Sequence, residues 1–537
     1  RRSSDLIHDA SEEISKDNIA LRVMNLANDT KISQDNSLLG DPTETAMVQY
    51  GLDKNYDVRE ELVNIPRVAE VPFDSTRKLM TTIHQLEDGK YLVATKGAPD
   101  MLLDRVTKIE KHGEVSTFTE DDRTTLMKLN KEMATQALRV LAMAYKVIDT
   151  LPETVDTDSI EHDLIFAGLV GMIDPERKEA AAAIKVAQSA GIRTIMITGD
   201  HRDTAQAIAK RLGILRPDQE DGVLTGGELN DISDEELERT VETYSVYARV
   251  SPEHKVRIVK AWQKNGKVVS MTGDGVNDAP SLKQADIGVG MGITGTEVSK
   301  GASDMVLADD NFETIVVAVE EGRKVFANIQ KAVQYLLSAN FGEVMTMFVA
   351  TMAGWSILEP IHILWINLVT DVFPAIALGL EEAEADIMNH PPRGKGSNFL
   401  SNGVLPSIFY QGFFEGGITL FVFWYATHIA NWGNPVGETM AFATLGLIQL
   451  FHAFNVKSVY KSLGTVGAFK NKMFNYAILV SAVMLLSVMV IPGLTTVFDV
   501  ATLTAEQWLF VVGAAFSIVP IVEIAKAIMR AMGMDKD

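Results

Sequence analysis

The chain has 537 residues, which at roughly 100 to 200 residues per domain predicts about three or four domains. It carries 49 Lys and Arg against 71 Asp and Glu, and the resulting formal net charge of −22 argues against a general nucleic-acid-binding protein. No cysteine is present, which excludes disulfide frameworks, thiolate zinc sites and cysteine nucleophiles. Any bound metal must therefore be held by oxygen or histidine ligands.

The first part of the chain, residues 1–150, predicts a separate α+β unit. Its strand-like stretches KLMTTIHQL and KYLVATKG flank an Asp88-Gly89 pair, which is typical of a β-hairpin turn. Residues 1–28 are polar and charged and have no secretory signal pattern. The acidic segment 149–163 is predicted to link this unit to the next one.

Residues 164–310 alternate apolar strands with helix-like segments. The strands begin with LIFAGLVGM and RTIMI and continue through VYARV to KVVSM. Such alternation predicts a parallel sheet covered by helices on both faces. Folds of this class place their chemistry at the carboxyl ends of the strands.

The strand KVVSM leads directly into TGDGVNDAP, a glycine-loosened loop that carries Asp274, Asn277 and Asp278. Two carboxylates at a strand end are suited to Mg²⁺ and a phosphoryl group, and the Asn277 amide adds a hydrogen-bonding group. A lone GDG triplet is more often an ordinary turn. A second loop of the same kind is therefore needed before a Mg²⁺- and phosphoryl-binding role is favoured over an ordinary turn.

That second loop follows RTIMI and consists of Thr198, Gly199 and Asp200. The Thr198 hydroxyl and nearby backbone N–H groups are predicted to bind a phosphoryl oxygen. Lys255 begins a helix shortly after Arg249 and is a candidate phosphate-binding cation. Taken alone, Lys255 is typical of a solvated helix residue.

Beyond about Gly322 the chain contains long apolar stretches with few charges, each near the ~20 residues that a membrane helix needs. Lys and Arg are confined to alternate loops, which predicts that the soluble half is cytoplasmic. The six predicted spans cover approximately residues 329–355, 361–380, 405–429, 440–456, 473–494 and 508–529.

Ionisable residues inside a membrane need a function or a partner, because inserting Asp at a helix centre costs roughly 2.5 to 3.5 kcal/mol. Asn340 and Glu343 lie three residues apart in the first span, and Asn367, Thr370 and Asp371 share a helix face in the second. These hard oxygen donors suit Ca²⁺ better than Cu⁺. Individually, Asn340 and Thr370 could instead hold helices together.

Other polar residues of the membrane half have plainer interpretations. Glu415 lies within a Gly412-x-x-x-Gly416 pattern, which is typical of close helix packing, and is expected near that interface rather than as an ion ligand. Glu523 is expected to be an end-of-helix residue near Lys526. Pro374 is expected to break its helix near the cation residues and to free backbone carbonyls. For Gln449 and His452 the sequence does not decide between a structural and a functional role.

The stretch TGDGVNDAPSLKQADIGVGMG resembles P-type ATPases, and the strand-loop pattern resembles the haloacid-dehalogenase phosphotransferase fold. The resemblance continues with DPERK around Asp174, MITGDH around Asp200 and KGAP around Lys96. ANFGEVM and ILWINLVTDVFPAIALGL are similar to the fifth and sixth helices of calcium pumps of the sarcoplasmic-reticulum type. The resemblance to P-type ATPases covers practically the whole chain.

The resemblance implies a multidomain fold. Residues 1–155 would be an α+β nucleotide-binding domain, residues 156–325 an α/β haloacid-dehalogenase-like phosphorylation domain, and residues 326–537 a six-helix all-α transmembrane domain. Phe73 would stack on adenine beside Lys78, although Phe73 could also be plain core, and Ser75 stands where many animal calcium pumps have an arginine. The nucleotide-binding residues implied by the resemblance are Glu44, Phe73, Lys78, Lys96, Gly97, Arg139 and Arg249.

In that family the phosphorylated aspartate lies in a DKTGT motif, which is absent from these 537 residues. The resemblance therefore implies the C-terminal portion of a pump, without the actuator domain and the first four helices, that would not turn over ATP alone. The implied activity is ATP-driven Ca²⁺ export with Mg²⁺ across a membrane, with a bacterial plasma membrane favoured. A Mn²⁺ or monovalent-cation pump and a non-catalytic membrane-tethered nucleotide-binding module are the alternatives.

The resemblance also bears on the number of ions. Gln449 stands where pumps that carry two calcium ions have a glutamate, so a single Ca²⁺ per cycle is expected. Glu343 would then carry protons in return or complete a weak second site.

Overall fold

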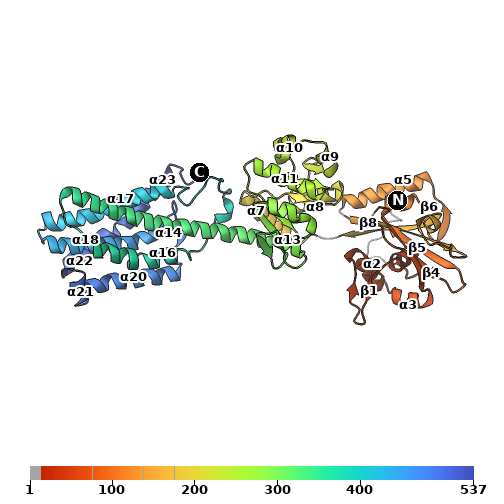
Figure 1. The fold of residues 1–537 in the computed structure, drawn as a ribbon, viewed down its shortest axis with the longest axis horizontal. Helices are drawn as coiled ribbons and strands as arrows, with labels where there is room; N and C mark the ends of the chain where they lie inside the picture. Colours follow the sequence, from red (N-terminus) through yellow and green to blue (C-terminus); the bar gives the residue numbers. More distant parts are fainter. Residues whose placement is uncertain (1–13, 75, 137, 174–175, 537) are drawn as a thin grey trace. The chain divides into compact units, whose positions relative to one another are not determined.

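The computed structural model describes residues 14–74, 76–136, 138–173 and 176–536. The chain divides into two compact units, and Figure 1 labels many of their helices and strands. The first unit comprises Arg1–Ile184 and Thr194–Asn265, and the second comprises Lys185–Arg193 and Gly266–Asp537. Ser75 and Asp174 lie outside the described residues. The domain boundaries expected at residues 155 and 325 stay predictions.

The first unit is built on a seven-stranded mixed sheet with the order β3-β4-β5-β8-β9-β6-β7. The predicted hairpin is confirmed: β4 and β5 pair antiparallel, and Gly89 in their turn has a φ of +85°. The strands are β3 (Arg67–Val71), β4 (Leu79–Gln85), β5 (Tyr91–Gly97), β6 (Val106–Lys111), β7 (Glu114–Thr117), β8 (Leu138–Ile148) and β9 (Leu164–Ile173).

Short helices accompany this sheet. The structure has α1 (Ile19–Leu26), α2 (Pro42–Asp53), α3 (Val58–Asn64), α4 (Pro99–Leu103), α5 (Glu120–Thr135) and α6 (Thr157–Ile160), with a two-stranded pair β1 (Lys31–Ile32) and β2 (Leu38–Leu39). Asp41 caps α2 through the backbone N–H of Thr43, and Pro42 occupies its first turn. This cap fixes where α2 begins, and so where Glu44 lies.

The prediction that LIFAGLVGM opens the parallel sheet is wrong. This segment is β9, which pairs antiparallel with β8 and parallel with β6 in the mixed sheet. Leu164 and Phe166 of β9 are buried in the same apolar cluster as Leu79 and Val93. Burial against these residues, together with a long ladder to β8, decides the partner, and neither feature is visible in the strand's own sequence.

The prediction that 149–163 is a linker is also wrong, because this segment packs against the mixed-sheet domain. Ile160 is buried, and the Glu161 side chain has no exposed area. Glu161 forms an ion pair with Arg77 at 2.9 Å and accepts a hydrogen bond from Thr81 at 3.0 Å. The buried carboxylate of this acidic segment is therefore neutralised by Arg77.

Parallel strand pairing is confirmed, but in two small sheets. β10 (Met196–Ile197), β12 (Val246–Ala248) and β11 (Val223–Thr225) form a three-stranded sheet in the first unit. β13 (Ser270–Gly273), β14 (Ile287–Met291) and β15 (Met305–Leu307) form another in the second unit. The helices around these strands are α7 (Lys178–Ser189), α8 (Arg202–Leu212), α9 (Gly226–Asn230), α10 (Asp234–Thr240), α11 (Pro252–Lys264), α12 (Ala279–Gln284) and α13 (Glu297–Gly301).

The remainder of the second unit is helical. Its longest helix, α14 (Phe312–Ala353), has 42 residues and at 1.5 Å per residue extends for about 63 Å. The others are α15 (Pro360–Trp365), α16 (Val372–Leu378), α17 (Val404–Trp424), α18 (Asn434–Asn455), α19 (Leu463–Val466), α20 (Lys472–Val490), α21 (Leu494–Val497), α22 (Ala505–Phe516) and α23 (Ile518–Ala531).

Within the described residues, four helical stretches are long and apolar enough to cross a membrane: Phe312–Ala353, Pro360–Leu378, Lys472–Val490 and Ala505–Ala531. Helices α17 and α18 have 21 and 22 residues and are not among these four. The existence of membrane-spanning helices is thus supported, while the number six stays a prediction.

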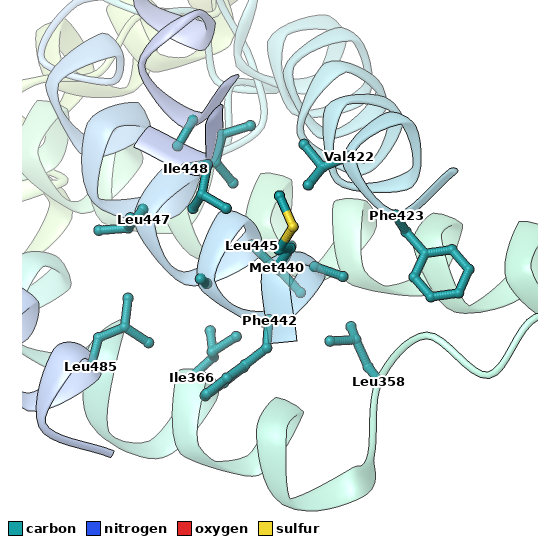
Figure 2. Packing of buried hydrophobic residues seen from close by; sticks show 14 of the residues in the cluster. Leu358, Ile366, Val422, Phe423, Met440, Phe442, Leu445, Leu447, Ile448 and Leu485 are labelled. Atoms are coloured by element: carbon teal, nitrogen blue, oxygen red, sulfur yellow. The ribbon is translucent and has the colours of Figure 1, made fainter. Parts of the chain in front are cut away.

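An apolar core holds the helices together (Figure 2). Met440, Phe442 and Ile448 of α18 are fully buried in it, and Ile366 and Phe423 approach them from the second predicted span and from α17. Because α18 supplies more of the buried residues of this core than any other helix, it lies at the centre of the bundle. Polar side chains on α18 are consequently placed in the bundle interior.

Candidate nucleotide, phosphate and cation sites

In the first unit, Lys96 and Glu44 form a largely buried ion pair. The Lys96 Nζ lies 2.6 Å from Glu44 Oε1 and also donates to the backbone carbonyl of Ala27. Burial lowers the pKa of the Lys96 ammonium, and the neighbouring Glu44 carboxylate opposes that shift. The structure therefore brings together two of the residues predicted to line a nucleotide pocket.

Gly97 lies where two strands approach closely. A Cβ at this position would lie 2.2 Å from the Lys78 carbonyl oxygen and 2.6 Å from Leu79 Cδ2, so only glycine fits without a shift of the backbone. Lys78 has a φ of +58° and its side chain is exposed. The close approach places Lys78 beside the strand that carries Lys96.

Phe73 is 62 % exposed, so the interpretation as plain core is wrong. Arg139 on β8 donates from Nη1 to Thr43 Oγ1 at 2.8 Å, and Thr43 precedes Glu44 in α2. The structure thus gathers Lys96, Gly97, Glu44 and Arg139 on adjoining elements of the first unit. An exposed aromatic ring before β4 is available for stacking on a base.

Replacing Phe73 with alanine is expected to weaken nucleotide binding by about 5- to 150-fold, because stacking of a base on an aromatic ring contributes roughly 1 to 3 kcal/mol. Equilibrium titration of the 537-residue chain with a fluorescent ATP analogue measures the effect. Val63→Ala, at a site 81 % exposed in α3 of the same unit, is the matched control. Unchanged affinity in Phe73→Ala would show that the ring does not stack on the base.

The Thr198–Asp200 loop and Arg249 lie next to one another at the ends of β10 and β12. The backbone N–H of Arg249 donates to the Asp200 carbonyl at 3.0 Å, and Val250 donates to the Thr198 carbonyl at 3.3 Å. Thr198 Oγ1 accepts from the Asp200 N–H at 3.1 Å, which fixes its hydroxyl at the loop. Lys255 lies in the first turn of α11, only a few residues beyond Arg249.

The Asp274–Asp278 loop belongs to the second unit and is organised by Asp278. The Asp278 carboxylate is buried and accepts the N–H groups of Asp274 and Gly275 at 3.2 and 3.0 Å. Asp274 and Asn277, by contrast, are exposed. Asp278 therefore positions the loop, whereas Asp274 presents its carboxylate to solvent at the carboxyl end of β13.

Two of the predicted cation residues are buried carboxylates in the helical part of the second unit: Glu343 on α14 and Asp371 after η4 (Ile366–Thr370), exposed by 5 % and 1 %. Gln449 Nε2 donates to Glu343 Oε1 at 3.1 Å. The Tyr335 hydroxyl donates to Asp371 Oδ1 at 3.3 Å. Two buried carboxylates without a basic partner need either protons or a bound cation.

Three neutral oxygens complete this cluster. Among the described residues, no hydrogen-bond partner reaches Asn367 Oδ1, Thr370 Oγ1 or Gln449 Oε1, although all three atoms are buried. Buried oxygens are normally satisfied, so these are open for a ligand. Across the described part of the chain no group of three or more His, Asp or Glu is placed to hold a metal, so a hard cation here needs these neutral oxygens as well.

The backbone around these residues departs from an α-helix. Residues Ile366–Thr370 form a π-helix between α15 and α16, and the N–H of Asp371 bonds to the Ile366 carbonyl at 2.9 Å. Pro374 has no N–H for the Thr370 carbonyl, but it lies inside α16, which continues to Leu378. The helix therefore departs from α-helical geometry at the π-helical turn before Pro374, and the expectation that it breaks at the proline itself is wrong. π-Helical turns frequently mark functional sites.

Not every predicted cation residue joins the cluster. Asn340 is exposed, because the face of α14 that is buried carries Tyr335, Ser338 and Gly342. The sequence interpretation missed Tyr335 altogether and left Gln449 open. The spacing of Tyr335, Ser338 and Gly342, at three and four residues, is the signal that would have marked this face.

The close packing predicted at Gly412 and Gly416 is confirmed. A Cβ at Gly416 would lie 2.8 Å from the Gly342 carbonyl oxygen, and one at Gly412 would lie 2.8 Å from the Ser338 carbonyl oxygen. Glu523 is not at a helix end as expected, since α23 continues to Ala531 and Glu523 lies 3.8 Å from the buried ammonium of Lys526.

Comparison with known protein families assigns most of the chain. Residues 18–179 match the cytoplasmic domain N of P-type ATPases, residues 102–286 match haloacid dehalogenase-like hydrolases, and residues 355–528 match the C-terminus of cation transporting ATPases. The chain belongs to the P-type ATPases. The expected phosphotransferase fold is thereby supported for the part that carries the Thr198 and Asp274 loops.

Three bacterial relatives of this P-type ATPase chain are named calcium-transporting ATPases. Identity is 44 % to "Calcium-transporting ATPase 1" of Bacillus cereus, over 97 % of this chain and 60 % of that protein. It is 43 % to the Bacillus subtilis enzyme, over 88 % of this chain and 53 % of that protein, and 42 % to a Lactococcus lactis enzyme, over 95 % and 57 %. The chain thus spans about 60 % or less of the length of these relatives.

Proposed function

We propose that this chain supplies the nucleotide-binding and cation-binding parts of an ATP-driven Ca²⁺ pump. The observation that carries the proposal is the buried cluster of Glu343 and Asp371 with three open neutral oxygens. Carboxylate and amide oxygens suit a hard divalent cation, and the π-helical turn at Ile366–Thr370 holds several of them on one short segment. The relatives' names add independent support for Ca²⁺.

Roles in the phosphoryl-transfer half follow from the two strand-end loops. Asp274, exposed at the end of β13, would hold Mg²⁺, with Asn277 beside it and Asp278 fixing the loop. Mg²⁺ would neutralise charge on the transferred phosphoryl group. Around β10 and β12, the groups proposed to bind phosphate are Thr198, Gly199, Asp200, Arg249 and Lys255.

The phosphate acceptor of the cycle would lie outside these 537 residues, since they contain no DKTGT motif. We expect the chain by itself to bind ATP through the Lys96 and Phe73 region without forming an acid-stable phosphoenzyme. Labelling of the purified chain with radioactive ATP, followed by acid quenching, measures this. A label that maps to an Asp of this chain would contradict the proposal.

The complete protein would contain an actuator domain and further helices before this portion, and would lie in a membrane with its soluble domains in the cytoplasm. A bacterial plasma membrane fits the organisms of the relatives. Helices α17 and α18 would then be spans in addition to the four that meet the criteria of length and composition.

Ion-dependent ATPase activity of the complete protein tests the choice of cargo. With Ca²⁺, Mn²⁺, Na⁺ and K⁺ compared at equal ionic strength, we expect stimulation at micromolar Ca²⁺. Stimulation by Mn²⁺ alone, or by a monovalent ion alone, would assign a different cargo to the same site. Nucleotide binding without any ion-stimulated hydrolysis would instead favour a non-catalytic membrane-tethered module.

A further inference from the structure

A second pair of ionisable side chains lies inside the helical part, apart from the proposed cation ligands. Glu415 on α17 and His452 on α18 are both without exposed area, and Glu415 Oε1 lies 3.3 Å from His452 Nε2. Among the described residues, neither carboxylate oxygen of Glu415 has a hydrogen-bond partner. An ionised carboxylate in this setting is costly, so the group requires a proton or a cation.

Hydrogen bonds around His452 determine where its proton lies. Asn455 Nδ2 donates to Nδ1 of the ring at 3.2 Å, so the ring hydrogen is on Nε2. The Ser338 hydroxyl, 3.0 Å from Nε2, already donates to the Gln334 carbonyl at 2.6 Å and therefore accepts from the ring. The imidazole is thus neutral, and an additional proton would have to be held by Glu415.

Close helix packing keeps Glu415 in place next to the cation cluster. A Cβ at Gly342 would lie 3.1 Å from Glu415 Cβ and 3.2 Å from its Oε2, so the carboxyl group lies against the residue that precedes Glu343. The 3.3 Å between Glu415 Oε1 and His452 Nε2 leaves no space for a metal ion between these two groups. A proton is the one cation small enough for the observed spacing.

Neighbouring charges act on this pair from several elements. Glu343 of α14 and Asp371 after η4 are close enough to Glu415 for an electrostatic interaction, and both carry negative charge when ionised. Tyr335 of α14 lies close to the same carboxylates. The positive charge of Lys526 on α23 interacts electrostatically with His452. Without a metal, the two carboxylates disfavour a third negative charge at Glu415. A bound Ca²⁺ would reverse that influence.

We propose that the Glu415 carboxyl, which lies beside the neutral His452 ring, is a proton-binding site distinct from the cation ligands. Glu415 takes up a proton from water to form a carboxylic acid and returns it to water when Ca²⁺ binds at Glu343 and Asp371. By linkage, proton binding at Glu415 and Ca²⁺ binding oppose one another. The coupling rests on the proposed Ca²⁺ transport, whereas the proton site itself does not.

Proton release on Ca²⁺ binding tests the coupling without turnover. In the complete protein, a pH indicator and a Ca²⁺ titration together give protons released per Ca²⁺ bound. Glu415→Gln, which mimics the protonated side chain, is expected to bind Ca²⁺ and to release up to one proton fewer. The matched control is Glu506→Gln at an exposed position of α22, which should release the wild-type number.

Infrared spectroscopy tests the proton site independently of the cargo. In metal-free Glu343→Gln protein with isotope-labelled glutamate, a protonated carboxyl band should remain at neutral pH and disappear in Glu343→Gln/Glu415→Gln. Absence of that band overturns the proton site. An unchanged proton count in Glu415→Gln overturns the coupling, and loss of Ca²⁺ binding there would make Glu415 a cation ligand instead. Failure of the wild type to bind Ca²⁺ would refute the proposed function while the band still reports Glu415.

Discussion

Replacing Asp371 with asparagine is expected to abolish Ca²⁺-dependent phosphorylation of the complete protein. Asp371 is 1 % exposed, and its carboxylate accepts a hydrogen bond from the Tyr335 hydroxyl. Asparagine keeps the shape but removes one of the two negative charges that face a divalent ion. We expect Ca²⁺ affinity to fall at least about 100-fold, or about 2.7 kcal/mol. Phosphoenzyme formation as a function of free Ca²⁺ measures this.

Glu343→Gln is the comparison variant, for which a smaller loss of Ca²⁺-dependent phosphorylation is expected. Because Gln449 already donates to Glu343, an amide at this position keeps one contact, so the loss should be smaller and its pH dependence altered. Phosphorylation of Asp371→Asn from inorganic phosphate, a reaction that needs no bound Ca²⁺ in the proposed cycle, shows whether the variant is folded. Wild-type Ca²⁺ dependence in Asp371→Asn would remove this residue from the site.

Replacing Asp274 with asparagine is expected to reduce phosphorylation from ATP by at least about 100-fold, because the carboxylate is proposed to hold Mg²⁺ against the transferred phosphoryl group. The loop should stay folded, since Asp278 holds the backbone of Asp274 and Gly275. Initial rates of phosphoenzyme formation over a Mg²⁺ titration measure the effect.

Glu297→Gln is the matched control for this variant. Glu297 is 92 % exposed at the start of α13 and lies in the same unit, so its loss removes one negative charge without touching the β13 loop. Its phosphorylation rate should equal that of the wild type. A normal rate and a normal Mg²⁺ requirement in Asp274→Asn would show that another group binds the metal.

Local sequence was sufficient for features that depend on neighbours along the chain. The β4–β5 hairpin follows from two strand-like stretches around Asp88-Gly89, and the position of Asp274 follows from a strand that leads into a glycine-containing loop. Asn367, Thr370 and Asp371 were identified from their spacing on one helix. These three residues belong to a single turn, so their grouping needs no tertiary information.

Features decided by distant partners could not be predicted in this way. β9 joins the mixed sheet through its ladder with β8, and Glu161 is neutralised by Arg77, which lies 84 residues away. Gln449 meets Glu343 only because α18 occupies the centre of the bundle. Asn340 is exposed, away from the buried face of α14, for a related reason: the rotation of α14 about its axis is set by packing against α17.

Equilibrium binding of radioactive Ca²⁺ to the complete protein tests the central claim most directly. The cluster of Glu343, Asp371 and neutral oxygens includes a glutamine, Gln449, which brings no negative charge. We predict that one Ca²⁺ binds per protein without cooperativity, and that Asp371→Asn removes this binding. Cooperative binding of two Ca²⁺, or unchanged binding in Asp371→Asn, would contradict the account.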